Sequence, residues 1–488
     1  MSLGKMLEES CRAYGDRVAM IHEGEKLTYN DLNRAVNGVS HYLKSLGIKK
    51  DDKIGLMLPN CPAFIISYFA VQKIGAVAVT LNVMSTAYEL IHFLGDSESK
   101  AFITTASLAK RYEDIKGKVP ECRHLIVTDA ESDGPGFQKA VKDGPFELEL
   151  VELTDDDAAV IIYTSGLTSK SLGAVLTHGN LMGQSELLKV LCGTTKEDRG
   201  LAIIPFFHSF GAVANMLCAI RVGASMVLME RFTLDGIMTA IDREKVTFIA
   251  AVPRVFLGML LFDKLESVDI SSLKLCITGG APMPPEFIPQ FDEKFGINIM
   301  EGYGLTEASP VCSFSRLDLP RKPGSIGVAI PGVEARVLDD RDQELPPGEI
   351  GELVVRGYNV MKGYYGDPEA TADVIRSGWL HTGDLAKIDQ QGYIFITGRK
   401  KRMIITSGFN VYPRDVEKVL ELHPAVKEAK VISKEDLMRG EIVKALVVAK
   451  DDVAADEKDI MKHCRAYLSA YKVPRELEIV SNLGETAP

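Results

Sequence analysis

Seven consecutive residues of this chain read Glu301-Gly302-Tyr303-Gly304-Leu305-Thr306-Glu307. Two glycines flank an aromatic ring, and a hydroxyl group directly precedes a carboxylate. Such a segment suits a purine stacked on Tyr303, a phosphate hydrogen-bonded by Thr306 and a Mg²⁺ ion held by Glu307. Gly-Tyr-Gly also forms ordinary tight turns, so this interpretation needs support from elsewhere in the chain.

Three further segments supply that support. They are Tyr163-Thr164-Ser165-Gly166 upstream, and Gly378-Trp379-Leu380-His381-Thr382-Gly383-Asp384 and Thr397-Gly398-Arg399-Lys400-Lys401 downstream. In this order and at these separations, the four segments resemble the adenylate-forming superfamily of acyl-CoA synthetases, luciferases and peptide-synthetase adenylation domains. The resemblance covers nearly the whole chain, and it implies an enzyme that activates a carboxylic acid with ATP and Mg²⁺ and transfers it to CoA.

Composition narrows the class of protein. The 488 residues exceed what one hydrophobic core usually supports, so we expect at least two domains. Hydrophobic residues make up 46% and charged residues 25%, which is ordinary for a soluble enzyme. The net charge of −11 argues against a nucleic-acid binder, because phosphate contacts need a concentrated basic surface.

The cysteines and the apolar stretches indicate a compartment. The eight cysteines include no CxxC pair, so free thiols in a reducing cytoplasm are expected. No secretory signal is visible, and the apolar stretches 63–83 and 201–220 are interrupted by glycine, charged residues or proline. We therefore expect a cytoplasmic monomer or homodimer without a transmembrane segment, for which peripheral membrane contact is the remaining alternative.

Hydrophobic periodicity predicts an α/β protein. Apolar spacing predicts helices over 31–46 and 64–72 and buried strands over 53–58 and 75–81. This alternation favours layered α/β structure with largely parallel sheets. Further short strands are expected at 160–163, 248–252 and 275–278, and turn-rich β-structure is expected after residue 331.

The resemblance implies a division into two domains. Layered αβ sheets and a distorted β-barrel would form a large N-terminal domain, residues 1–398. The basic run 399–402 would be a hinge, and residues 403–488 would form a small mobile α+β domain. Pro413 is expected to open a helix in that domain, with Val416, Val419 and Leu420 on one apolar face.

Adenylation requires neutralised phosphates, an aligned carboxylate and a site shielded from water. The resemblance implies catalytic roles for His208, Thr306, Glu307 and Lys401, with Glu307 as the metal ligand. It further implies that nucleotide or pantetheine is contacted by Thr164, Ser165, Gly166, Thr168, Gly279, Gly280, Ala281, Gly302, Tyr303, Gly304, Asp384, Ile396, Arg399, Ser407 and Gly408. For Asp384 and Arg399 the implied partner is the ribose, and the alternative is a salt bridge between domains.

Two regions depart from the family pattern. The phosphate loop has Leu167, Ser169, Ser171 and Leu172 where hydroxyl, glycine, proline and lysine are usual, with Lys170 as a substitute cation. Residues 484–488 read Gly-Glu-Thr-Ala-Pro in place of the family's Pro-Lys-Thr-x-Thr-Gly-Lys motif, about two residues short of its catalytic lysine. Either the chain is truncated or adenylation is weak.

Several absences bear on the substrate. The single tryptophan, Trp379, lies far from the position where acetate-type relatives close the pocket, and no aspartate follows the aromatic segment to bind an amino group. Apolar residues at Phe206, Phe207, Phe210 and Val311 favour a medium- or long-chain fatty acid, with aryl acids as the second class. A non-catalytic acyl- or nucleotide-binding protein, and an enzyme that stops at acyl-AMP or loads a carrier protein, are the alternative functions.

Overall fold

The computed structural model describes residues 1–130, 135–145, 147–164, 171–400, 403–436, 439–450, 453 and 455–483. The phosphate-loop residues Ser165, Gly166, Thr168 and Lys170 lie outside the described residues. So do Lys401 and the terminal segment 484–488. The roles expected for them stay predictions.

A seven-stranded sheet follows the first helices, as the alternating pattern predicts. Its strand order is β18-β8-β7-β4-β3-β5-β6, in which the run from β7 to β6 is parallel. The strands are β3 (Lys53–Met57), β4 (Val77–Thr80), β5 (Ala101–Thr104), β6 (His124–Val127), β7 (Ala158–Thr164), β8 (Leu172–Thr177) and β18 (Gly363–Tyr364).

Helices cover both faces of this sheet, because alternate strand residues point to opposite sides. Ile54 and Leu56 of β3 pack with α2 (Tyr29–Ser45) and α3 (Pro62–Lys73). Met57 and Phe102 pack on the other face with α4 (Ala87–Asp96). The predicted helices and strands of this region are confirmed to within a few residues.

A nine-stranded sheet lies beside the first, in the order β15-β14-β13-β12-β11-β9-β10-β1-β2. Its strands are β1 (Val18–His22), β2 (Glu25–Thr28), β9 (Arg199–Ala202), β10 (Ser225–Leu228), β11 (Phe248–Ala251), β12 (Leu275–Thr278), β13 (Ile299–Gly304), β14 (Val311–Phe314) and β15 (Val328–Ala329). One hydrophobic core joins the two sheets, and a second core lies under α11 (Leu234–Glu244), α12 (Pro253–Leu260) and α13 (Phe287–Phe295).

The turn-rich β-structure expected after residue 331 is a five-stranded sheet. It consists of β16 (Val333–Leu338), β17 (Gly351–Gly357), β19 (Ile375–Arg376), β20 (Trp379–Ile388) and β21 (Ile394–Arg399), with α14 (Pro368–Val374) alongside. The mixed α/β fold with its half-barrel sheet is therefore confirmed.

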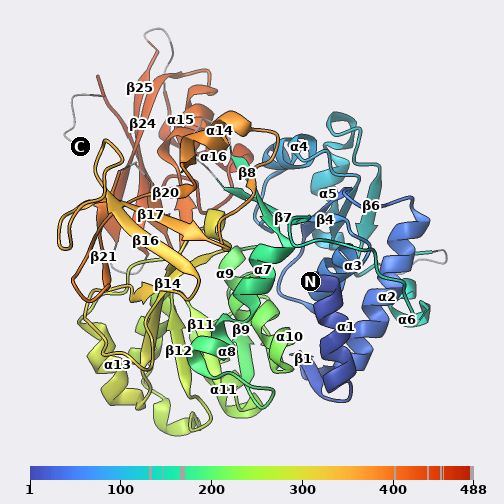
Figure 1. Cartoon of the computed structure of the whole chain (residues 1–488). Helices are drawn as coiled ribbons and strands as arrows, with labels where there is room; N and C mark the ends of the chain where they lie inside the picture. Colours follow the sequence, from blue (N-terminus) through green and yellow to red (C-terminus); the bar gives the residue numbers. More distant parts are fainter. Residues whose placement is uncertain are drawn as a thin grey trace.

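The last part of the chain forms a separate small unit, drawn in orange and red in Figure 1. It contains β22 (Ile404–Thr406), β23 (Phe409–Val411), α15 (Pro413–Glu421), β24 (Val426–Asp436), β25 (Gly440–Ala449), α16 (Glu457–Tyr467) and β26 (Glu476–Ile479). Val416, Val419 and Leu420 of α15 are buried in its own core, as the apolar stripe predicts.

A buried ion pair joins this unit to the N-terminal part. Lys472 Nζ lies 2.8 Å from Glu89 Oε1 of α4, and both side chains are less than 9% exposed. Ser469 Oγ donates to Glu89 at 2.5 Å, and Thr86 Oγ1 donates to the Tyr467 carbonyl at 3.0 Å. The two parts are thus held together by a buried ion pair and two hydrogen bonds.

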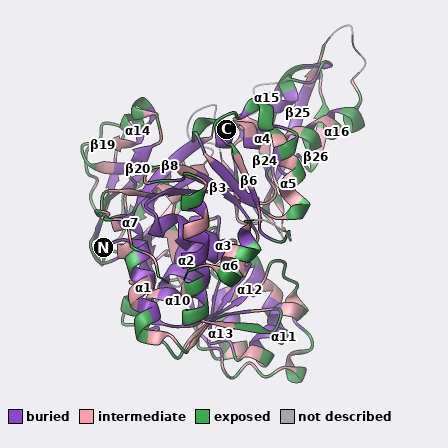
Figure 2. Ribbon diagram, turned by 90° about the vertical axis from the view of Figure 1, so that its right-hand side faces the viewer, coloured by how far each residue is buried: buried purple, intermediate pink, exposed green. Residues whose placement is uncertain are grey.

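The burial pattern accounts for the apolar stretch 201–220. This stretch divides into the end of β9, the short α9 (Ser209–Gly211), a π-helical segment η2 (Ala212–Leu217) and the start of α10 (Cys218–Val222). Figure 2 shows buried strands between helices whose outer sides are exposed. Over the described residues, no helix is long and apolar enough to cross a membrane.

Candidate active site

One cavity of about 320 Å³ lies where the two sheets, the half-barrel and the C-terminal unit meet. It is reached by the carboxyl ends of β12 and β13, where open α/β sheets commonly bind ligands. The structure brings together at this cavity the following expected residues: Thr164, His208, Gly279, Gly280, Ala281, Gly302, Tyr303, Gly304, Thr306, Glu307, Asp384, Ile396, Arg399 and Gly408.

Close backbone contacts explain two of the glycines. A Cβ on Gly279 would lie 2.9 Å from the Gly302 carbonyl oxygen. The segment after β12 can therefore approach strand β13 this closely only because residue 279 has no side chain. A Cβ on Gly304 would lie 1.9 Å from the carbonyl oxygen of Pro310. These contacts leave backbone edges open to a flat ligand.

The Glu307 carboxylate is held by two hydroxyl groups. Glu307 lies in the 3₁₀ turn η4 (Thr306–Ala308), after β13. Thr164 Oγ1, at the end of β7, donates to Oε1 at 3.0 Å, and the Tyr364 hydroxyl donates to the same oxygen at 2.9 Å. Thr306 lines the cavity beside it.

This donor set fits a Mg²⁺ ion that is bound together with phosphates. Within the described part of the chain, no group of three or more His, Cys, Asp or Glu side chains could cage a metal. Mg²⁺ commonly takes one or two carboxylates and completes its shell with phosphate oxygens and water. Glu307 supplies such a carboxylate.

Asp384 and Arg399 are paired neighbours on adjacent strands of the half-barrel sheet. Arg399 Nε of β21 donates to Asp384 Oδ1 of β20 at 3.1 Å, and both residues line the cavity. The Tyr303 hydroxyl donates to Asp384 Oδ2 at 2.5 Å. Asp384 and Arg399 thus form an ion pair at the wall of the cavity, and an acceptor beside a donor suits a ligand that carries a vicinal diol.

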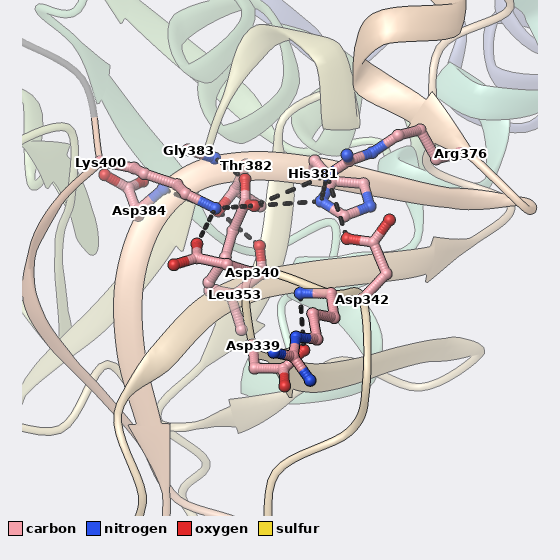
Figure 3. Close-up of polar contacts among 12 residues, drawn as sticks. Asp339, Asp340, Asp342, Leu353, Arg376, His381, Thr382, Gly383, Asp384 and Lys400 are labelled. Carbon is pink, nitrogen blue, oxygen red and sulfur yellow. Dashed lines mark hydrogen bonds and ion pairs between the residues drawn. The ribbon is translucent and has the colours of Figure 1, made fainter.

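Glu352 hydrogen-bonds to the segment that carries Asp384, whose residues His381, Thr382 and Gly383 are labelled in Figure 3. Its carboxylate is 6% exposed and accepts from the Gly383 N–H at 3.1 Å, next to Asp384. Lys400 Nζ donates to it at 3.4 Å and pairs with Asp340 at 2.8 Å. His381 Nδ1 lies 3.1 Å from Glu352 Oε2. The cluster fixes the backbone that carries Asp384.

His208 lies at the cavity as the N-cap of α9. Its Nδ1 accepts from the Phe210 N–H at 3.2 Å, which leaves Nε2 to carry the ring proton. Burial lowers the pKa of His208 to about 4, so the ring is neutral at physiological pH. A neutral donor of this kind can orient a carboxylate without forming an ion pair with it.

Part of the cavity lining is apolar, and we call this part the apolar branch. Its lining residues come from α8 (Leu187–Cys192), α9, η2 and β14, and they are Leu187, Leu188, Leu191, Phe210, Val213, Ala214, Val311 and Phe314. Phe210 and Val311 were expected there. Phe206 and Phe207 were also expected, but they are 1% and 7% exposed and belong to the core behind the cavity.

The C-terminal unit contributes a hairpin to the cavity. The turn between β22 and β23 is formed by Ser407 and Gly408, with φ of 54° and 86°. Gly408 lines the cavity, and a Cβ there would lie 2.7 Å from Val252 Cγ1. Ser407 is not among the lining residues, and its hydroxyl accepts from Arg254 Nη1 at 3.3 Å.

Comparison with known proteins decides the family. The model of the AMP-binding enzyme family matches residues 7–365, and the model of its C-terminal domain matches residues 415–488. The chain belongs to the AMP-binding enzyme family. The AMP-binding enzymes of this kind are AMP-forming acid–CoA ligases, whose substrates include ATP and CoA.

Similar AMP-binding enzymes differ in their acids. A long-chain-fatty-acid–CoA ligase of Bacillus subtilis is 34% identical over 516 residues, which cover 100% of this chain and 92% of the relative. A feruloyl-CoA synthase of Amycolatopsis is 35% identical over 99% of this chain and 96% of the relative. The amide bond synthetase McbA of Marinactinospora thermotolerans has a TM-score of 0.90 at 28% identity, covering 99% and 96% of the two chains.

Three residues of the site were missed by the sequence analysis. Tyr364 and Glu352 act through hydrogen bonds to Glu307 and to the Gly383 backbone, across 57 and 31 positions. Glu301 lines the cavity as the first residue of the quoted segment. The only local feature around Tyr364 was the tripeptide Gly363-Tyr364-Tyr365 within a predicted β-region. Nothing in that tripeptide predicts a hydrogen bond to Glu307.

Proposed function

We propose that this AMP-binding enzyme ligates a medium- or long-chain fatty acid to CoA through an acyl-adenylate. The carboxylate oxygen attacks the α-phosphorus of ATP and pyrophosphate leaves. The CoA sulfur then attacks the acyl carbon and AMP leaves. The observation that supports this most is the single cavity in which Glu307, Asp384, Arg399 and the Gly408 hairpin share walls with an apolar branch.

Each residue has a task in this proposal. Asp384 and Arg399 hold the ribose, Tyr303 and the glycine edges hold adenine, and Thr306 binds phosphate oxygens, while the Thr164 hydroxyl holds Glu307. Glu307 would hold Mg²⁺, which neutralises phosphate charge when bound. The neutral His208 orients the acid, and burial by the hairpin shields the adenylate from water.

The two hydrophobic walls support the choice of acid. Leu187, Leu188 and Leu191 of α8 and Val213 and Ala214 of η2 line the branch, and no charged side chain from these helices does. An alkyl chain gains about 0.8 kcal/mol for each CH₂ buried in such surroundings. Aryl acids are the second class, because the relative named feruloyl-CoA synthase is as similar to this chain as the fatty-acid ligase.

We also propose the division into residues 1–398, a hinge at 399–402 and a domain from 403. The separate core of the C-terminal unit supports it, as does a second family model that begins at residue 415.

A competition experiment tests the substrate proposal. The protein is incubated with ATP, Mg²⁺, CoA and an equimolar mixture of C2 to C18 fatty acids, benzoate and hydroxycinnamates, and the thioesters are separated by mass spectrometry. Acyl-CoA products centred on C8 or longer are expected. Products confined to the aryl acids would replace the fatty-acid proposal by the aryl one, and amides or free adenylates would contradict both.

A further inference from the structure

Tyr364 lines the cavity, and its strand pairs with β8. It is the second residue of β18, which pairs antiparallel with β8, so that Tyr364 lies opposite Ala174. β8 is the strand that follows the phosphate loop. The Tyr364 N–H donates to Thr371 Oγ1 at 2.9 Å, and the side chain is 7% exposed. Both the backbone and the ring are therefore fixed.

The contacts of Glu307 are unequal between its two carboxylate oxygens. Oε1 accepts from the Tyr364 hydroxyl at 2.9 Å and from Thr164 Oγ1 at 3.0 Å. The Met361 N–H donates to the Glu307 carbonyl at 2.8 Å, which fixes the backbone. Among the residues that the structure describes, none donates a hydrogen bond to Oε2. Within the described part of the chain, the hydrogen bonds to this carboxylate therefore fall on Oε1.

We propose that Tyr364 is a positioning residue for metal binding: its hydroxyl, with that of Thr164, fixes Glu307 Oε1 so that Oε2 is presented to the Mg²⁺ of bound MgATP. This inference rests on the proposed function, because it takes MgATP as the ligand of the cavity.

Physical chemistry favours this role over simple packing. Mg²⁺ demands near-ideal octahedral geometry, so a carboxylate that rotates freely binds it less well. Hydrogen bonds to ligating carboxylates commonly change metal affinity by 10- to 100-fold.

The alternative is that Tyr364 only fills space, since its ring belongs to the main hydrophobic core. A packing role and a positioning role predict different effects of Mg²⁺ on nucleotide affinity. Loss of packing would alter nucleotide affinity with and without Mg²⁺. Loss of a positioning hydrogen bond would alter only the affinity that Mg²⁺ adds.

The neighbouring residue offers a matched control. Tyr365 follows Tyr364 in the chain, but its hydroxyl donates to Glu98 at 3.3 Å, and its ring lies 5.1 Å from Lys53 Nζ. Tyr364→Phe and Tyr365→Phe each remove one hydroxyl and keep the ring. Only the first removes a hydrogen bond to Glu307.

The test measures ATP binding by calorimetry in the absence of acid and CoA, once with excess Mg²⁺ and once with EDTA. For Tyr364→Phe we expect wild-type affinity in EDTA and a loss of about tenfold or more in the affinity gained with Mg²⁺. Tyr365→Phe should match the wild type in both buffers, and melting temperatures without nucleotide show that both variants are folded.

Three results would overturn the inference: an unchanged Mg²⁺-dependent gain in Tyr364→Phe, an equal loss in both buffers, or no gain from Mg²⁺ in the wild type. The proposed function fails differently. A wild type that binds MgATP but forms no acyl-CoA would contradict the ligase proposal and leave the role of Tyr364 standing.

Discussion

Glu301 begins the segment that carries Tyr303 and Glu307, and its carboxyl group lines the cavity. Burial raises its pKa from the ordinary 4.5 to about 7, against a smaller opposing effect of Arg321. Between these two pH values the native state holds a proton that the unfolded state has lost. Stability therefore falls as the pH rises from about 4.5 to 7 and stays lower above that range.

Replacing Glu301 by glutamine removes this cost. Glu301→Gln should raise stability at pH 8 by up to about 3 kcal/mol and leave it unchanged at pH 4, since one pKa unit corresponds to about 1.4 kcal/mol. Thermal unfolding at both pH values measures the effect, with the exposed Glu349→Gln as control. A shift of equal size at pH 4 and pH 8 would contradict the assignment.

Gly408 leads to a prediction about one half-reaction. The Cβ of Gly408→Ala would lie 2.7 Å from Val252 Cγ1, at a φ of 86° that alanine rarely adopts. We expect the hairpin to be displaced, so that transfer to CoA slows by about tenfold or more. Acid-dependent pyrophosphate release in the absence of CoA should persist.

A control variant at a second glycine distinguishes the effect of backbone strain from that of the steric clash with Val252. Gly392 has a φ of 85° and open space around its Cβ position, so Gly392→Ala carries similar strain without a clash. It should leave both half-reactions unchanged. If Gly408→Ala slowed both half-reactions equally, the hairpin would have no specific role in the thiol step.

Residues with a chemical signature of their own could be predicted from the sequence. Asp384, Arg399 and Glu307 carry charges within recognisable segments, and the structure brings all three to the cavity. Tyr364 and Glu352 could not be predicted, because each acts by a hydrogen bond to a distant residue that no local pattern encodes. Phe206 and Phe207 were wrongly predicted to line the cavity, because aromatic character alone does not distinguish a residue of the cavity lining from one buried in the core behind it.

At the scale of helices and strands, hydrophobic periodicity predicted the elements whose apolar residues follow one clear spacing. α3, β3 and β12 lie within a few residues of expectation, because each is a continuous apolar or amphipathic run. The π-helical η2 and the short α8 were not predicted. A π-segment has no sequence period of its own, yet such segments often occur at functional sites, and η2 lines the apolar branch.

The η2 wall predicts control of chain length. Ala214→Phe should fill the apolar branch and lower activity on a C16 acid by about tenfold or more relative to a C6 acid, because added volume excludes the longer chain. Ratios of initial rates measure it. Val190→Phe is the control, since Val190 is 61% exposed on α8 and lies outside the branch. An equal loss on both acids would place the acyl chain elsewhere.

At the scale of the whole molecule, the Glu89–Lys472 pair holds the C-terminal unit against α4. Breaking one partner of a buried pair leaves an uncompensated charge, which costs about 3–5 kcal/mol in the docked state. Lys472→Met should therefore release the unit and expand the molecule, as small-angle scattering would show.

Two variants control this prediction. The double variant Glu89→Gln with Lys472→Met removes both charges of the pair and keeps a side-chain oxygen for the Ser469 hydroxyl, so it should restore the compact form. Lys444→Met removes an ion pair with Glu478 inside the C-terminal unit, and it should cause no expansion. Unchanged scattering for Lys472→Met would mean that the other contacts suffice to hold the unit.

Both sheets, the half-barrel and the C-terminal hairpin meet at one cavity, where the ligase reaction would take place. The most direct measurement is the stoichiometry of one reaction with MgATP, CoA and a C12 acid, in which AMP, pyrophosphate and acyl-CoA are quantified together. We predict equal amounts of all three and none without the acid. AMP and pyrophosphate without thioester, or no turnover at all by a folded protein that binds ATP, would contradict the assignment as an acyl-CoA ligase.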